Sequence, residues 1–180
     1  GGAIVSSNKN YITKSKYLIN QAKDRSFDYI HNSVGYNYRL SNLHSAIGLS
    51  QIESIKFILN KKIKIRQQYS KIFKNNKNIS LIKTPEYSIN NNWLNVIYFK
   101  NVTKKKKLLI YKMLEKNKIF VRKIWQLNHL QAPYKKFQIY KINNAIKIQE
   151  NSLCLPSGID LKINEINKIG KIIIDITKNF

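Results

Sequence analysis

The segment Gly35–Asn42 reads GYNYRLSN and combines a turn glycine, two tyrosines, an amide, a guanidinium and the start of a helix. Ser41 is a favourable N-cap residue for that helix. Unpaired N–H groups at a helix N-terminus attract anions. Asn37 could donate an amide proton to a phosphate oxygen, and Arg39 could form a fork with a carboxylate or diphosphate. The alternative is an aromatic-rich turn in which Arg39 pairs with a local acid such as Asp28.

The helical pattern that starts at Ser41 continues to about Phe73, which is long for one helix of a globular protein. It indicates either a kink near Glu53–Ser54 or a long helix that joins two domains. Upstream, the pattern predicts a buried strand end at Gly1–Val5, a helix over residues 10–22 and a long irregular loop over residues 24–37. Long loops in compact proteins often carry function.

Beyond the long helix the hydrophobic period changes to that of a mixed α and β segment. A helix capped by Thr103, a short helix and a final helix striped with isoleucine alternate with strand candidates. A small α+β domain is therefore expected from residue 54 onward. The strands are expected at 79–82, 93–99, 119–122 and 153–155, and the helices at 103–117, 145–151 and 164–176.

The composition of the 180 residues is ordinary except for charge, since 33 basic and 9 acidic residues give a net charge of +24. Such an excess favours polyanions. However, most of the basic residues are lysines, spread along the chain among Ile, Asn and Tyr, which AT-rich codons also encode. We therefore attribute the charge mainly to mutational bias. The densest runs, Lys61–Lys64 and Lys104–Lys107, lie in helical patterns and indicate solvated faces.

Several site classes find no support in the sequence. The single cysteine, Cys154, excludes an internal disulfide framework and a multi-cysteine zinc site. The three histidines have no Cys, Asp or Glu at metal-ligand spacing, so no metal site is expected. No apolar run has the length of a membrane span, and no signal peptide is evident. The segment Trp125–Tyr134 offers rings and polar tips suited to a sugar or a base, or else forms a small hydrophobic cluster under a loop.

Three segments resemble the DegT/DnrJ/StrS family, whose members are sugar-nucleotide aminotransferases of the pyridoxal-phosphate (PLP) fold type I. They are Gly1–Val5, His31–Leu43 and Ala46–Glu53. Further segments resemble a subgroup that aminates C4 of nucleotide-linked 4-keto-6-deoxy sugars, on routes to bacillosamine- and legionaminic-acid-type products. These are Trp93–Asn95, Arg122–Trp125, His129–Tyr134 and Ser152–Ser157.

The resemblance implies an α/β fold that is the C-terminal part of such an enzyme. Residues 1–53 would be the end of the large PLP-binding domain with an interface loop and helix, and residues 54–180 the small C-terminal α+β domain, with a long interdomain helix at their junction. In this family the Schiff-base lysine lies just upstream of the position of Gly1. The chain is therefore expected to hold no catalytic residue and to be inactive alone.

The resemblance also implies roles for particular residues. Asn37 matches an asparagine that reaches the PLP phosphate of the partner in a homodimer. Arg39, His31, Trp125 and His129 match positions near the substrate. The expected partners are a nucleotide sugar and an amino-acid donor, glutamate, with no nucleic acid and no membrane insertion, in the cytoplasm. The alternatives are a basic nucleic-acid-binding module and a catalytically inactive interaction fragment.

Overall fold

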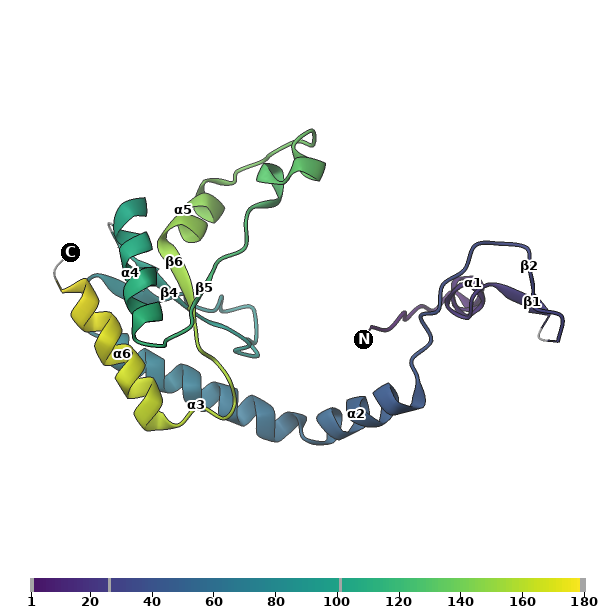
Figure 1. Cartoon of the computed structure of the whole chain (residues 1–180), viewed down its shortest axis with the longest axis horizontal. Helices are drawn as coiled ribbons and strands as arrows, with labels where there is room; N and C mark the ends of the chain where they lie inside the picture. The colour runs from purple at the N-terminus through teal and green to yellow at the C-terminus, as the bar shows by residue number, and fades with distance from the viewer. Residues whose placement is uncertain (1, 26, 101, 179–180) are drawn as a thin grey trace. The chain divides into compact units, whose positions relative to one another are not determined.

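The computed structural model describes residues 2–25, 27–100 and 102–178. The chain divides into two units, Gly1–Ile55 and Lys56–Phe180, and each is described by itself (Figure 1). None of the helices in the described ranges combines the length and the hydropathy that a bilayer crossing requires.

The first unit begins with α1 (Lys9–Ile19), which Asn8 caps by accepting a hydrogen bond from the N–H of Asn10 at 2.9 Å. The helix predicted over residues 10–22 is confirmed, but it ends earlier. Gln21 and Ala22 both have positive φ, at 66° and 51°, which takes the chain out of the helical region. The chain therefore turns back towards α1 just after the helix ends.

The irregular loop predicted over residues 24–37 contains a short antiparallel pair, β1 (Lys23–Arg25) and β2 (Ile30–His31). The Asp24 carboxylate organises this segment. It accepts hydrogen bonds from the Tyr17 hydroxyl at 3.1 Å and from the Asn32 backbone N–H at 2.6 Å. The prediction of a wholly irregular loop was wrong because these contacts join residues that no local pattern relates.

The strand predicted at Gly1–Val5 does not form. Gly1 lies outside the described residues, and residues 2–6 have no regular structure. Ile4 and Val5 are 62% and 92% exposed. A strand requires a neighbour that accepts and donates its backbone hydrogen bonds. In the part of the chain that the structure describes, no segment pairs with this one.

The long helical pattern after Ser41 forms two helices, α2 (Asn42–Glu53) and α3 (Ile55–Phe73). Ser41 caps α2 as predicted, with its hydroxyl oxygen 3.4 Å from the His44 N–H. Ser54 lies between the helices, and its N–H still bonds to the Ser50 carbonyl at 3.2 Å. The expected long helix is thus interrupted at Ser54, at the position of the predicted kink.

The second unit is built on a four-stranded antiparallel sheet in the order β3-β4-β6-β5. Ile97 in the central strand β4 lies opposite Leu81 on one side and Leu153 on the other. All four strands are confirmed at or near their predicted positions, although β5 begins where the predicted strand ended. Their bounds are β3 (Ile79–Leu81), β4 (Asn95–Phe99), β5 (Arg122–Lys123) and β6 (Ser152–Leu155).

Helices complete the second unit and supply its core. Ile166, Ile169, Ile173 and Ile176 form the predicted stripe of the last helix, and all four are buried. They pack in one cluster with side chains of the sheet and of α3, such as Phe99. The helices are α4 (Lys104–Lys116), which Thr103 caps as predicted, α5 (Asn143–Asn151) and α6 (Ile163–Thr177). Two short 3-10 helices, η1 (Asn128–Leu130) and η2 (Ala132–Tyr134), lie in the segment Trp125–Tyr134 that the sequence singled out.

Candidate functional site

Three backbone hydrogen bonds attach the segment Tyr36–Tyr38 to the end of α1. The N–H groups of Tyr36 and Tyr38 donate to the carbonyls of Leu18 and Ile19 at 2.7 and 3.0 Å, and the N–H of Gln21 donates to the Tyr36 carbonyl at 3.1 Å. The segment is therefore held in an extended form against the end of the helix.

Gly35 makes this attachment sterically feasible. A Cβ at position 35 would lie 2.3 Å from the Ala22 nitrogen and 2.3 Å from the Gln21 carbonyl carbon. These are backbone atoms, which cannot rotate away as the end of a side chain could. The glycine of the motif therefore lets two backbone segments approach closely.

The two tyrosines of the motif stack on each other, with ring centroids 5.2 Å apart and an interplanar angle of 15°. Alternate residues of an extended chain share a side, so Asn37 projects away from this stack. The side chains of Asn37 and Arg39 are exposed. Within the described residues neither has a hydrogen-bond partner, and Arg39 forms no ion pair with Asp28. The amide and the guanidinium are therefore both available to a ligand.

His31 lies on the same framework, at the end of β2. Its Nδ1 is 2.8 Å from the Gln21 carbonyl oxygen. A carbonyl oxygen can only accept, so Nδ1 is the donor of this hydrogen bond. The structure thus ties His31 and the Tyr36–Tyr38 segment to the same turn at Gln21.

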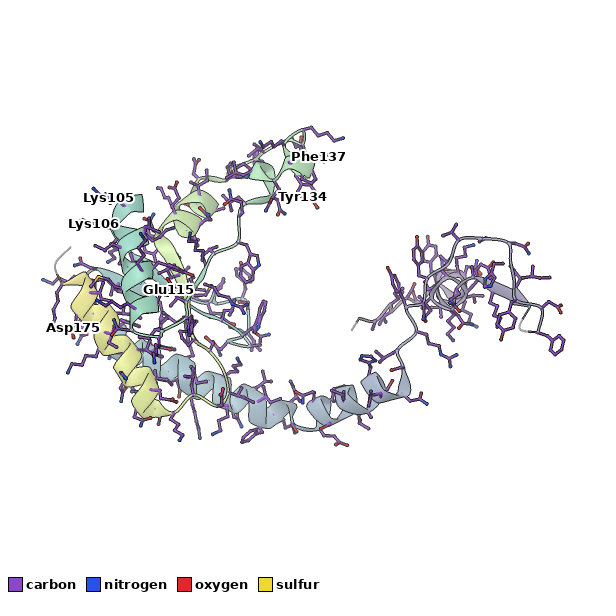
Figure 2. The ribbon with its side chains drawn as sticks, viewed as in Figure 1. Lys105, Lys106, Glu115, Tyr134, Phe137 and Asp175 are labelled. Carbon is purple, nitrogen blue, oxygen red and sulfur yellow. The ribbon has the colours of Figure 1, made fainter. Side chains whose placement is uncertain are left out.

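In the second unit, Trp125 and His129 line one cleft of about 490 Å³. Its wall continues with Tyr140 and the first turn of α5. Tyr134, which the sequence grouped with them, does not line this cleft. Figure 2 shows it with Phe137 at the far end of the excursion between β5 and α5, and their ring centroids are 6.4 Å apart.

A neighbouring cleft of about 310 Å³ is lined by Lys62, Trp93, Arg122 and Cys154, among others. Trp93 lines this cleft and Trp125 lines the first one, and the centroids of their rings are 5.9 Å apart. Burial raises the pKa of the Cys154 thiol above its ordinary value, and the positive charge of Arg122 opposes that shift. A raised pKa leaves the thiol protonated near neutral pH, which argues against a nucleophilic role for it.

Sequence reasoning missed Lys62, because it lies in the run Lys61–Lys64 that indicated a solvated face. Lys62 is in fact half-buried, and its ammonium donates to the carbonyls of Trp93 and Ser157. Its position three residues before the buried Ile65, on the same side of α3, was the available signal. Lys107 departs similarly from its predicted solvated face, with its ammonium 3.1 Å from the Gln149 carbonyl.

No cluster of three or more metal-ligating side chains occurs among the residues that the structure describes. The candidate site residues offer hydrogen-bond donors, positive charges and aromatic rings. Amide and guanidinium donors lie on the first unit, and cations beside exposed indole rings lie on the second. Each set belongs to its own unit.

The fold is that of about half of a PLP fold-type I sugar aminotransferase. The structure of PseC from Helicobacter pylori, described as an aminotransferase involved in pseudaminic acid biosynthesis, matches 98% of this chain with a TM-score of 0.85 and 22% identity. The sugar aminotransferase Spr1654 from Streptococcus pneumoniae, in its PMP form, matches 99% with a TM-score of 0.83 and 17% identity. The chain covers 48% and 47% of these two proteins.

A profile of the DegT/DnrJ/EryC1/StrS aminotransferase family matches residues 1–174, and the chain belongs to this family. EpsN of Bacillus subtilis (strain 168), named as a pyridoxal phosphate-dependent aminotransferase, is 25% identical over 98% of this chain and 46% of its own length. The UDP-4-amino-4,6-dideoxy-N-acetyl-beta-L-altrosamine transaminase of Campylobacter jejuni (strain 81-176) is 39% identical over 48% of this chain and 24% of its own length. The chain thus spans at most about half the length of these relatives.

Proposed function

We propose that the protein is a PLP-dependent aminotransferase that aminates C4 of a nucleotide-linked 4-keto-6-deoxy sugar, with glutamate as the donor. The observation that carries the proposal is the attachment of the GYNYRLSN segment to α1, which leaves Asn37 and Arg39 exposed and without partners among the described residues. Family membership and the nucleotide-linked amino sugars in the names of the Campylobacter transaminases and of the GDP-perosamine synthases support it.

The residues present fit the cofactor. The Asn37 side chain offers N–H donors with no partner among the described residues, on a backbone that three hydrogen bonds hold in place. A phosphate oxygen is a strong acceptor for such a donor. We infer that the protein is a homodimer and that Asn37 binds the PLP phosphate in the partner subunit. When bound, PLP supplies the electron sink through which an amino group is transferred.

The other residues act on the substrate in this proposal. Arg39 binds a carboxylate or diphosphate oxygen through its fork, and His31 presents Nε2 to the substrate because Nδ1 donates to Gln21. Trp125 and His129 contact the sugar nucleotide from their shared cleft. In the same proposal, residues 1–53 are the end of the PLP-binding domain and residues 54–180 are the small domain.

The activity is tested directly with the full-length protein, PLP, glutamate and UDP- or GDP-linked 4-keto-6-deoxy sugars. We expect a product with an amine at C4, identified by mass spectrometry and NMR. Arg39→Ala should lower kcat/KM roughly 10- to 100-fold, the contribution of a hydrogen bond to a charged group. Circular dichroism should show little change in folding.

Arg39→Lys serves as the matched variant, because lysine keeps the charge but loses the planar fork. It should recover only part of the lost kcat/KM. Absence of amination with every substrate would contradict the proposed function and favour an inactive interaction protein. Unfolding of Arg39→Ala would instead assign Arg39 a structural role.

Asn37→Ala should weaken PLP retention roughly 10- to 100-fold, because one charge-assisted hydrogen bond to the phosphate is lost. The measurement is a titration of the full-length apoprotein with PLP, followed by absorbance. Asn32→Ala is the matched control, since Asn32 lies on the same framework and uses its backbone N–H rather than its side chain. Equal PLP affinity of the wild type and Asn37→Ala would refute the proposed contact.

A further inference from the structure

Asp24 lies on β1, and its carboxylate contacts two segments that are separate in the sequence. We propose that Asp24 is a positioning residue, which holds the loop that carries His31 in the orientation needed to meet the substrate. The inference rests on the proposed function for the role of His31. It goes beyond that function because it assigns a role to a residue that contacts neither the substrate nor the cofactor and acts through His31.

One contact of Asp24 joins the β1–β2 pair to α1. The hydroxyl of Tyr17 lies 3.1 Å from Oδ1 and 3.2 Å from Oδ2 of the carboxylate, so its proton is shared between the two oxygens. Tyr17 is in the last turn of α1, and the carbonyls at this end of the helix also accept the N–H groups of Tyr36 and Tyr38. Asp24 therefore attaches the strand pair to the same helix end that holds the GYNYRLSN segment.

The other contact of Asp24 is directly beside His31. Its Oδ2 accepts the backbone N–H of Asn32, the next residue in the chain, at 2.6 Å. A hydrogen bond to a charged acceptor is stronger than one between neutral groups. The backbone of His31 also pairs with Lys23, and its ring donates to the Gln21 carbonyl at 2.8 Å. The position of His31 is thus restrained through its backbone, its ring and its neighbour.

Apolar packing contributes little to holding His31. The strand β2 has two residues, Ile30 and His31, and both are exposed. A two-stranded pair is at best marginally stable in water by itself. The orientation of the loop therefore depends on the hydrogen bonds that Asp24 accepts. A loop that is already held in place loses less conformational entropy when a ligand binds.

Asp24→Asn tests the proposal, because it keeps the size of the side chain but removes the charge that strengthens both contacts. In the full-length protein, we expect the KM for the sugar substrate to rise about 3- to 10-fold, the effect of replacing a charge-assisted hydrogen bond by a neutral one. The kcat should change by less than about twofold, because His31 binds the substrate in the ground state and in the transition state alike.

A double-mutant cycle with His31→Ala shows whether Asp24 acts through His31. When residue 31 is already alanine, Asp24→Asn should raise the KM by less than about 1.5-fold. Independent effects that multiply in the double variant would overturn the proposal, because Asp24 would then act by another route.

Nuclear magnetic resonance gives a readout that needs no activity. In Asp24→Asn the ring signals of His31 should shift, and the backbone amide of Asn32 should exchange faster with solvent, because its acceptor is weakened. Tyr17→Phe keeps the ring but removes one of the two contacts, so it should cause a smaller change in the same direction. It tests the proposal even if Asp24→Asn unfolds, and thermal unfolding of each variant identifies any loss of fold.

Asp28→Asn is the matched control. Asp28 lies in the turn between β1 and β2, is exposed and has no hydrogen-bond partner within the described ranges. The variant therefore removes the same charge from the same hairpin without touching the contacts at Asn32. It should leave the KM within about 1.5-fold and the His31 ring signals in place. An effect equal to that of Asp24→Asn would show that only the net charge of the hairpin matters, which overturns the proposal.

The possible results separate this inference from the proposed function. An unchanged KM in Asp24→Asn, in a protein that aminates a sugar, overturns the positioning role and leaves the function intact. A protein that aminates no sugar refutes the function, and the position of His31 is then decided by spectroscopy. Ring signals that shift in Asp24→Asn but not in Asp28→Asn support the positioning role, and ring signals that stay in place in both variants overturn it.

Discussion

Gly35→Ala should detach the GYNYRLSN segment from α1 and markedly weaken PLP retention by the full-length protein. The added Cβ would lie 2.3 Å from backbone atoms of Gln21 and Ala22. The clash can be relieved only if the two backbone segments separate. This separation strains or breaks the backbone hydrogen bonds from Tyr36 to Leu18 and from Gln21 to Tyr36. Overpacking of this kind costs about 1–3 kcal/mol, and more where backbone must move.

Amide hydrogen exchange measures the effect locally. Protection of the Tyr36 and Tyr38 amides should fall in Gly35→Ala, because both donate to the end of α1. Gly48→Ala is the matched control, since no atom lies within 4 Å of a Cβ at that position and Gly48 is inside α2. It should be neutral or stabilise the helix by about 0.5–1 kcal/mol. Unchanged exchange at Tyr36 and Tyr38 would show that the contact does not constrain the segment.

Phe99→Ala should destabilise the second unit by about 3–5 kcal/mol. Phe99 is 1% exposed at the end of the central strand β4 and belongs to the cluster formed with α3, α4 and α6. Its removal leaves a cavity among side chains that already pack closely, such as Tyr69 and Ile173. Chemical denaturation of the full-length protein, with a fit that allows more than one transition, measures the loss.

Phe57→Ala is the control for this effect. Phe57 lies on α3 and is 61% exposed, so the same change in composition removes little buried surface. Alanine also has a higher helix propensity than phenylalanine. The free energy of unfolding should change by less than about 1 kcal/mol. A loss from Phe57→Ala as large as that from Phe99→Ala would mean that Phe99 is not a principal core residue.

Local periodicity predicted most of the secondary structure. The caps at Ser41 and Thr103, the break near Ser54 and the isoleucine stripe of α6 were all readable, because each depends on residues within a few positions of one another. The predictions were wrong where contacts between residues distant in the sequence determine the local structure. The β1–β2 pair depends on Asp24 contacts with Tyr17 and Asn32, and no residue type marks them in advance.

Some residues of the candidate site could be identified from local sequence, and others could not. A motif of adjacent residues singled out Asn37 and Arg39, whereas a charge run concealed Lys62. The carbonyl that holds the Lys62 ammonium belongs to Ser157, 95 residues away. Whether a lysine on a helix is solvated or held depends on what packs against that side of the helix, and only the assembled sheet supplies this.

By itself, the sequence determined the order and type of most elements, the choice of the GYNYRLSN segment as a candidate anion-binding site and the family resemblance, since these depend on neighbouring residues. The tertiary structure decided which side chains meet. It brought Gly35 against Gln21 and Ala22, placed Trp125 and His129 in one cleft, and set Lys62 and Arg122 beside Trp93. Such contacts between side chains depend on strand order and helix packing, which are long-range properties of the folded chain.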